Sequence, residues 1–163
     1  MSANVAKEGV TSVSGFKPEV TPFLWFDNQA AEAAAFYVRV FAAAGKPAAQ
    51  EQEKSGPAQV VAVTFELNGL KLVAFNGGPH FKFNEAISLS VSCESQEEID
   101  YFWDALVEGG NESQCGWLKD KYGLSWQIVP KEIGRLMQAP AARAALCTMK
   151  KLDLAVLEKA AQS

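Results

Sequence analysis

The stretch QVVAVTFELNGLKLVAF, residues 59–75, decides the fold of this chain. Apolar and polar residues alternate on both sides of Asn68-Gly69, and this dipeptide is typical of a two-residue β-hairpin turn. A second such stretch, CGWLKDKYGLSWQIV, covers residues 115–129 and turns at Tyr122-Gly123. Each stretch predicts two neighbouring antiparallel strands, and their similarity indicates a repeated unit.

A helical pattern precedes each hairpin. QAAEAAAFYVRVFAAAG has apolar residues at helical spacing, and SQEEIDYFWDALVEGG begins with Ser95 and Glu98 in the pattern of a capping box. Strand-like segments stand before the two helices, EVTPFLWFD at residues 19–27 and AISLSVSC at 86–93. The helices match at an offset of 66 residues and the hairpins at 54, so a longer loop in the first half absorbs 12 residues.

This repetition predicts an α+β fold in which two βαβββ modules form a shared cavity, followed by a helical C-terminal extension. Half-sheets of this kind bury their open sides by pairing, which leaves a cavity between them. The expected divisions are a flexible lead-in at 1–18, the first module at 19–78, the second at 79–130 and the extension at 131–163. The polar stretch KPAAQEQEKSGPA (46–58) is expected to be mostly loop, with part of an edge strand.

The extension is predicted to be helical after Pro130, with Pro140 in a first helical turn. An apolar stripe runs at spacings of three and four along this segment. Its members are Leu146, Met149, Leu152 and Val156. A stripe of this kind packs a helix on its own domain or against a partner chain, and we favour the first interpretation.

Composition limits the function classes. The 163 residues are 48% hydrophobic, and the net charge of −4 with a pI near 5.1 argues against nucleic acid as a partner. No apolar run reaches the roughly 18 residues that span a bilayer, so we expect no membrane partner. The three cysteines form no CxxC motif, which favours free thiols and a cytoplasmic protein.

Three longer stretches together resemble a known family. They are TPFLWFD with AAEAAAFY, LNGLKLVAFNGGPHFKFNEAISL, and ESQCGWLKDKYGLSWQIVP. They are similar to the vicinal oxygen chelate (glyoxalase/bleomycin resistance/dioxygenase) superfamily, and closest to its PhnB-like, demethylubiquinone-methyltransferase-like branch. The resemblance covers about residues 20–130 and extends to the helical tail. It implies paired βαβββ modules and a homodimer. A methyl-donor site is not supported, because no glycine-rich loop follows a strand and opens a helix.

The resemblance also implies where a metal site would lie. Metal-binding members of the superfamily place His, Glu or Gln on the first and last strands of each module. Here the last strands offer Gln127 and, at an offset of 54, Val73, while the first strands at 20–25 and 86–91 contain no His, Asp or Glu. A divalent ion needs about three suitable protein ligands. We therefore expect no metal and no other cofactor.

The candidate ligand-binding residues are the cavity-facing polar side chains and the strand aromatics. By alternation, Gln127 shares a face with Ser125 and Val129, while Trp126 and Ile128 face the helix. The amide of Gln127 then either contacts a ligand or satisfies a neighbouring strand. The predicted set is Phe23, Trp25, His80, Ser88, Ser90, Trp117 and Gln127. Which face of its strand Trp25 occupies stays open, because both faces are apolar.

Other reactive side chains have simpler interpretations. His80 lies in the connector between modules, as a loop histidine or as an acid/base at the cavity edge. Cys115 is expected to be a free thiol, and Lys119 and Asp120 are expected to be solvated charges at the last turn.

Three functions follow from these observations. The first is a metal-independent protein that binds an unidentified small molecule in an aromatic-lined cavity. The alternative is a metal-dependent lyase, isomerase or dioxygenase of the same superfamily. The third is a structural role with a filled cavity. Whether the protein is an enzyme stays open.

Overall fold

The computed structural model describes residues 19–55 and 61–163, and the predicted lead-in at 1–18 lies outside them. The first half contains β1 (Phe23–Phe26), α1 (Ala30–Ala43), β2 (Ala48–Ser55), β3 (Val61–Leu67) and β4 (Leu70–Asn76). The second contains β5 (Leu89–Cys93), α2 (Gln96–Val107), β6 (Asn111–Glu112), β7 (Trp117–Lys119) and β8 (Ser125–Pro130). The extension contains α3 (Ile133–Leu136), α4 (Pro140–Cys147) and α5 (Leu154–Ala161).

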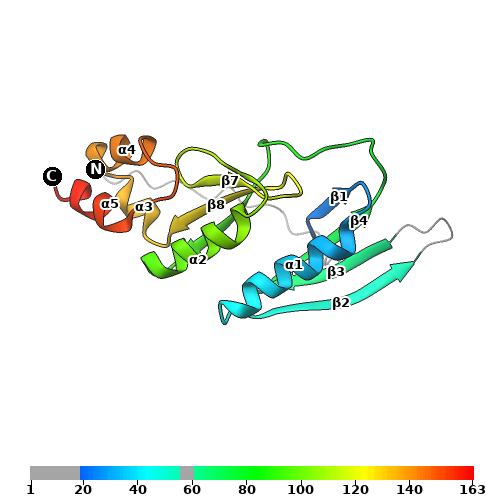
Figure 1. The fold of residues 1–163 in the computed structure, drawn as a ribbon. Helices are drawn as coiled ribbons and strands as arrows, with labels where there is room; N and C mark the ends of the chain where they lie inside the picture. The colour runs from blue at the N-terminus through cyan, green and yellow to red at the C-terminus, as the bar shows by residue number, and fades with distance from the viewer. Residues whose placement is uncertain (1–18, 56–60) are drawn as a thin grey trace, which may run out of the picture.

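Each half forms a four-stranded sheet, and the two sheets have the same strand order. The orders are β1-β4-β3-β2 and β5-β8-β7-β6. In both, the first strand runs parallel to the last, and the remaining pairs are antiparallel. Figure 1 shows the two modules beside each other, with the three C-terminal helices beyond the second module. The predicted α+β fold with two βαβββ modules and a helical extension is therefore confirmed.

In the first module, α1 covers one face of the sheet. Leu24 and Phe26 of β1 point to that face and are buried, as are Phe65 of β3 and Leu72 of β4. Because strand side chains alternate, Phe23 and Trp25 lie on the opposite face. We call the face of each sheet opposite its helix the open face. This assignment settles which side of β1 Trp25 occupies.

The second module follows the same rule. Trp126 and Ile128 of β8 are buried in the core with Phe102 and Trp103 of α2, as the alternation predicts. Gln127 lies between them in sequence and on the open face, where it is half-buried. The helix α2 begins at Ser95, whose hydroxyl oxygen accepts a hydrogen bond from the Glu98 amide at 3.3 Å.

Several boundaries differ from the predictions. The stretch expected to be mostly loop forms β2, an eight-residue strand that pairs along β3. Its sequence is polar, and its backbone pairing with β3 holds it in the sheet without an alternating apolar pattern. The short strand β6 was not predicted. The capping box is incomplete, because the Glu98 carboxylate accepts from the Glu94 amide at 2.9 Å rather than from the helix cap residue.

The C-terminal extension packs on its own chain. Pro140 begins α4 as predicted, but the apolar stripe does not lie on one helix, because the chain leaves helical geometry between α4 and α5. There, the carbonyls of Met149 and Lys150 accept hydrogen bonds from the amides of Cys115 and Gly116, at 2.8 Å each. These bonds dock the segment on the second module. A small core forms there from Val129, Leu136, Leu152 and Leu157, whereas Val156 of the predicted stripe is exposed. Within the described residues, no helix is long and apolar enough to cross a membrane.

Candidate functional site

The two modules meet through α1 rather than through their open faces. The ring of Tyr37 in α1 lies 5.3 Å from that of Trp126, and Phe41 lies 5.0 Å from Phe102. The Tyr101 hydroxyl also donates to the Val40 carbonyl at 2.8 Å. The helix side of the first module is thus buried against the core of the second, and the open faces take no part in these contacts.

Asp120 is the polar centre of this junction, and its predicted role as a solvated turn charge is wrong. It is only 2% exposed. Its carboxylate accepts hydrogen bonds from the Tyr37 hydroxyl at 2.7 Å and the Trp126 indole at 2.8 Å. The backbone amides of Tyr122 and Leu124 donate to its other oxygen at 2.8 and 3.1 Å. We call Asp120, Tyr37 and Trp126 the inter-module anchor.

The anchor residues have shifted protonation equilibria. Burial raises the pKa of the Asp120 carboxyl, and the hydrogen bonds from Tyr37 and Trp126 oppose that rise. Burial also raises the pKa of the Tyr37 phenol, with a further contribution from the nearby Asp120 charge. The tyrosine therefore stays a hydrogen-bond donor at neutral pH, which is consistent with a structural role for this cluster.

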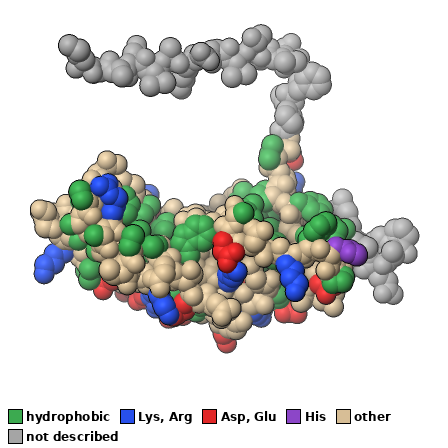
Figure 2. Space-filling view, turned by 90° about the horizontal axis from the view of Figure 1, so that it is seen from above, with side chains coloured by type: hydrophobic (Ala, Val, Ile, Leu, Met, Phe, Trp, Pro, Cys, Tyr) green, Lys and Arg blue, Asp and Glu red, His purple; other side chains and the backbone are tan. Residues whose placement is uncertain are grey.

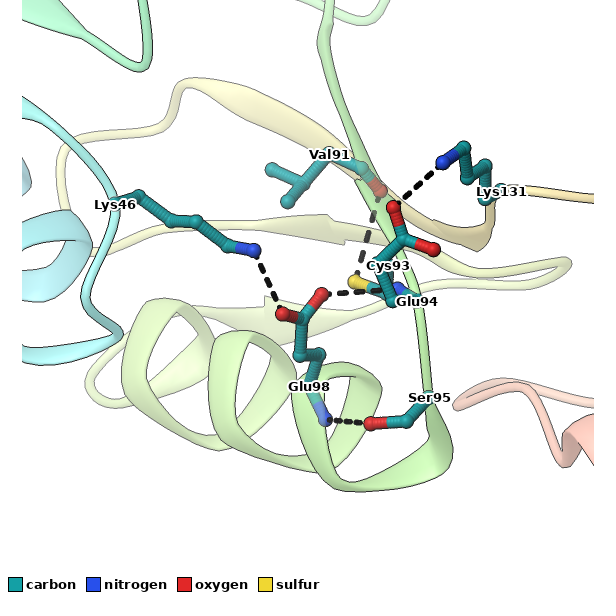
Figure 3. Close-up of polar contacts among 7 residues, drawn as sticks. All are labelled: Lys46, Val91, Cys93, Glu94, Ser95, Glu98 and Lys131. Atoms are coloured by element: carbon teal, nitrogen blue, oxygen red, sulfur yellow. Dashed lines mark hydrogen bonds and ion pairs between the residues drawn. The ribbon is translucent and has the colours of Figure 1, made fainter.

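A cavity of about 310 Å³ opens between the modules at the edge of β5. Its walls include Phe41, Lys46 and Asn68 from the first module. Among the predicted site residues it contains only Ser90. Figure 3 shows polar contacts beside it, where the ammonium of Lys46, a lining residue, reaches across the module boundary to the Glu98 carboxylate at 2.7 Å. Lys46 thus already has an anionic partner, and its hydrogen bond lowers the pKa of Glu98.

A second cavity, of about 320 Å³, lies beside Trp25 and has aromatic walls from both modules. Its aromatic side chains are Trp25, Phe26, Phe81, Phe83 and Tyr122. Three pairs of these rings lie edge to face, with centroids 4.9 to 5.9 Å apart. Such contacts hold the rings in defined positions. This cavity is not the one that the sequence predicts between the open faces of the two half-sheets, because the modules of one chain meet through α1, and Phe26 belongs to the helix side of β1.

Trp25 is held rigidly at the mouth of this cavity. Its indole N–H donates to the Gly78 carbonyl at 2.9 Å, so the polar end of the ring is satisfied. A Cβ atom on Gly77 would lie only 2.1 Å from the ring, so the indole sits directly against the glycine backbone. Phe81 remains 65% exposed at its edge, and Phe23 on the neighbouring strand position is 61% exposed. Figure 2 shows hydrophobic side chains gathered in patches on the face in view.

The polar candidates lie together on the open face of the second module. The Gln127 amide nitrogen donates to the Ser88 hydroxyl oxygen at 2.8 Å. Ser90 and Trp117 are the register partners of Gln127 on the two adjacent strands, so all four belong to one surface. Gln127 faces away from α2 as predicted. The bond to Ser88 shows that a neighbouring side chain satisfies one of its donors.

The predicted site residues therefore fall into two groups. Phe23 and Trp25 belong to the first module, and Ser88, Ser90, Trp117 and Gln127 to the second. His80 is exposed in the connector that follows Gly78. The predicted set lacks Phe81, which is a cavity wall, and Ser125, which is a buried hydroxyl on the open face. The aromatic spacing of Phe81 and Phe83 was a usable signal for the first, whereas alternation gave the face of Ser125 but not its burial.

The residues of these surfaces do not fit a divalent metal ion. Across residues 19–55 and 61–163, no three His, Cys, Asp or Glu side chains lie close enough together to share an ion. The surface around Gln127 offers an amide and hydroxyls, which are weak ligands for first-row metals.

The paired βαβββ modules have the fold of the vicinal oxygen chelate class. Three solved structures share this architecture. The PhnB protein from Bacillus cereus is 30% identical, covering 69% of this chain and 99% of its own, with a TM-score of 0.61. Protein PA1353 from Pseudomonas aeruginosa is 17% identical, covering 70% and 98%, with a TM-score of 0.55. The fosfomycin resistance protein FosX from Listeria monocytogenes, in complex with Mn(II) and sulfate, is 13% identical, covering 69% and 91%, with a TM-score of 0.52.

Residues 18–129 match the family model described as 3-demethylubiquinone-9 3-methyltransferase, and the chain belongs to this PhnB-like family. No curated protein matches the chain. The predicted family is confirmed, and its placement in the vicinal oxygen chelate superfamily agrees with the structural relatives.

Proposed function

We propose that this PhnB-like protein is a metal-independent binding protein for a small, partly aromatic or apolar molecule. The observation that carries the proposal is the cavity of about 320 Å³ beside Trp25, with five aromatic side chains from both modules. Its volume lies within the roughly 300–1,000 Å³ of small-molecule sites. Rings that are already locked by edge-to-face contacts lose little freedom when a ligand binds.

A test of this role uses an aromatic fragment library in a thermal-shift screen. The best fragment is then titrated against the wild type, Phe81→Ala and Val156→Ala. Phe81 is 65% exposed, so its truncation leaves the fold intact, and Val156 is a 45% exposed apolar control in the extension. Phe81→Ala should weaken binding and Val156→Ala should not. Equal affinity in all three proteins would remove the aromatic cavity from the site.

The polar surface of the second module is expected to contact a ligand through Gln127. Loss of one such hydrogen bond costs roughly 1–3 kcal/mol, which is about 5- to 150-fold in affinity. Gln127→Ala should show this loss, while Gln138→Ala, an exposed amide at the end of α3, should bind like the wild type. Unchanged affinity in Gln127→Ala would show that Gln127 serves only its bond to Ser88.

We further propose that two copies of the chain pair through their open faces and complete the binding cavity. The modules of one chain meet through α1, so their open faces do not cover each other, although the extension covers the Val129 end of the second face. Phe23 is 61% exposed on the open face of the first module, and Ile87, just before β5, is 57% exposed. Light scattering should give the mass of a dimer for the wild type and of a monomer for Phe23→Asp. A wild-type monomer at all concentrations would contradict the pairing.

The alternative is a metal-dependent lyase, isomerase or dioxygenase, and it can be tested directly. FosX, which shares the fold, is described in complex with Mn(II). The protein would be purified without a metal-chelating tag, incubated with Mn²⁺, Ni²⁺, Zn²⁺ or Fe²⁺, desalted and subjected to elemental analysis. We expect no metal to remain. One retained equivalent would overturn the metal-independent proposal and make enzyme assays the next step.

A further inference from the structure

A third cavity, of about 250 Å³, lies on the open face of the second module, beside Ser125 at the beginning of β8. Its side-chain lining is polar except for Trp117 and Leu118. The polar members are Glu85, Asn111, Glu112, Ser113, Lys119 and Ser125. None of the functions discussed above uses this cavity, although Trp117 joins it to the surface around Gln127 through their shared register.

The Ser125 hydroxyl is the unusual feature of this cavity. Ser125 is 1% exposed, and among the described residues its Oγ has no hydrogen-bond partner. Buried hydroxyls normally have partners, and an unpaired one costs folding free energy. Ser125 lies directly opposite Lys119 in the β7–β8 register and therefore on the same face. A group that enters the cavity beside Lys119 can satisfy it.

The charges around this cavity cancel. Lys119 pairs with Glu85, and the Lys150 ammonium pairs with Glu112 at 3.1 Å. The hydrogen bond from Lys119 lowers the pKa of Glu85, so the carboxylate stays ionised. Within the lining, a bound anion would meet the carboxylates of Glu85 and Glu112, and a bound cation would meet the Lys119 ammonium. Lys150 is not part of the lining, but its ion pair neutralises Glu112. The charge balance favours a neutral ligand with many hydrogen-bonding groups.

We propose that this cavity binds a neutral polyhydroxylated group, such as a sugar ring or a cyclic polyol. Carboxylates accept hydrogen bonds, ammonium groups donate them, and the amide of Asn111 and the hydroxyl of Ser125 do both. Vicinal hydroxyls can use such a mixed set at close spacing. Trp117 supplies an apolar wall for the C–H face of the ring. The volume of about 250 Å³ is below that of drug-sized sites and suits one ring.

This inference rests on the proposed small-molecule-binding function and adds the class of ligand on the second module. A ligand that has a hydroxylated ring and an aromatic or apolar part would use both surfaces. In a pair of chains the two parts could come from different protomers. The inference can fail while the aromatic cavity still binds fragments, so the two proposals are separable.

The test measures saturation transfer from the full chain to D-glucose, D-galactose, D-ribose and myo-inositol. Gluconate and glucose 6-phosphate serve as anionic probes. Three proteins are compared: the wild type, Ser125→Ala and Ser92→Ala. Ser92 is the matched control, because it lies exposed on the same face of the sheet and outside this cavity.

We expect at least one neutral probe to bind the wild type and Ser92→Ala, with about 5- to 100-fold weaker binding to Ser125→Ala. Without ligand, Ser125→Ala should melt at or above the wild-type temperature, because it removes an unpaired buried hydroxyl. A serine with only a structural role would instead lower the melting temperature without a selective effect on binding.

Three results would overturn the inference. They are no transfer from any neutral probe, binding of the anionic probes alone, or equal binding of a neutral probe by Ser125→Ala and the wild type. If aromatic fragments still bind in a Phe81-dependent manner, the polyol site alone is wrong. If neither fragments nor polyols bind, the proposed binding function itself is wrong.

Discussion

The inter-module anchor makes a sharp prediction about stability. Tyr37→Phe removes a 2.7 Å hydrogen bond to a buried carboxylate. Hydrogen bonds to charged groups are worth about 1.5–3 kcal/mol, so the free energy of unfolding should fall by that amount. For a chain of this length, each kcal/mol shifts the melting temperature by roughly 2–4 °C. Urea unfolding at neutral pH, with the slope checked for constancy, measures the loss.

Tyr101→Phe is the matched control for this variant. Its hydroxyl also joins the two modules, through a bond of 2.8 Å to the Val40 carbonyl, but the acceptor is neutral and Tyr101 is 36% exposed. We expect a loss of only about 0.5–1.5 kcal/mol. A Tyr37→Phe variant no less stable than Tyr101→Phe would refute the anchor as a charged, buried contact.

Asp120→Ala should cost more than either tyrosine variant. It leaves the donors of Tyr37 and Trp126 and two backbone amides without their acceptor. Removing one side of a buried charged contact costs about 3–5 kcal/mol, a large part of a typical total of about 5–15 kcal/mol. In a double-mutant cycle with Tyr37→Phe, the two losses should not add, because both remove the same bond. Additive losses would contradict the geometry.

Three further predictions concern pH, thiol reactivity and one glycine. The hydrogen bond from Lys46 lowers the pKa of Glu98, so it stabilises the fold fully at pH values above the ordinary glutamate pKa. This stabilisation is lost as the pH falls through the lowered pKa of Glu98. The difference in melting temperature between the wild type and Glu98→Gln should therefore shrink as the pH falls from neutral through that pKa. Burial raises the pKa of Cys93 to about 12, and Cys147 is exposed. Ellman's reagent should therefore label Cys147 in the folded protein and Cys93 only after unfolding. Labelling of Cys93 in the folded protein would contradict its burial. Gly77→Ala should displace Trp25, because the new Cβ atom would lie 2.1 Å from its ring. The free energy of unfolding should fall by about 1–3 kcal/mol, and the tryptophan fluorescence should change. An unchanged fluorescence spectrum would show that the ring does not lie against this glycine.

The parts of the fold that could be predicted depend on local signals. The Asn68-Gly69 turn, the strand alternation around Gln127 and the repeated order of elements all come from neighbouring residues, and the structure agrees with each. The strand β2 was underestimated because its polar sequence carries no period, and its pairing with β3 decides its conformation. The break between α4 and α5 also depends on a distant segment, because the backbone carbonyl of Met149 accepts a hydrogen bond from the amide of Cys115.

The candidate site was harder to predict for the same reason. Asp120 looked like a turn charge because its partner Tyr37 lies 83 residues away. The cavity beside Trp25 draws on the connector and on Tyr122 of the second module, so no single stretch of sequence contains it. Alternation gave the face of Gln127 correctly, but it could not show that Ser125, on the same face, lacks a partner.

The inter-module anchor stabilises the fold of this chain, whereas the open faces are proposed to bind its ligand. The anchor satisfies all its donors within one chain, so its loss should change the free energy of unfolding and leave the affinity of the folded protein unchanged. Ser125 is the opposite case, because its unpaired hydroxyl adds nothing to the stability of the free protein. Tyr37→Phe and Ser125→Ala should therefore move stability and ligand affinity independently. If both variants changed both quantities together, the open faces would have to be coupled to the module junction, and the junction would then belong to the binding site.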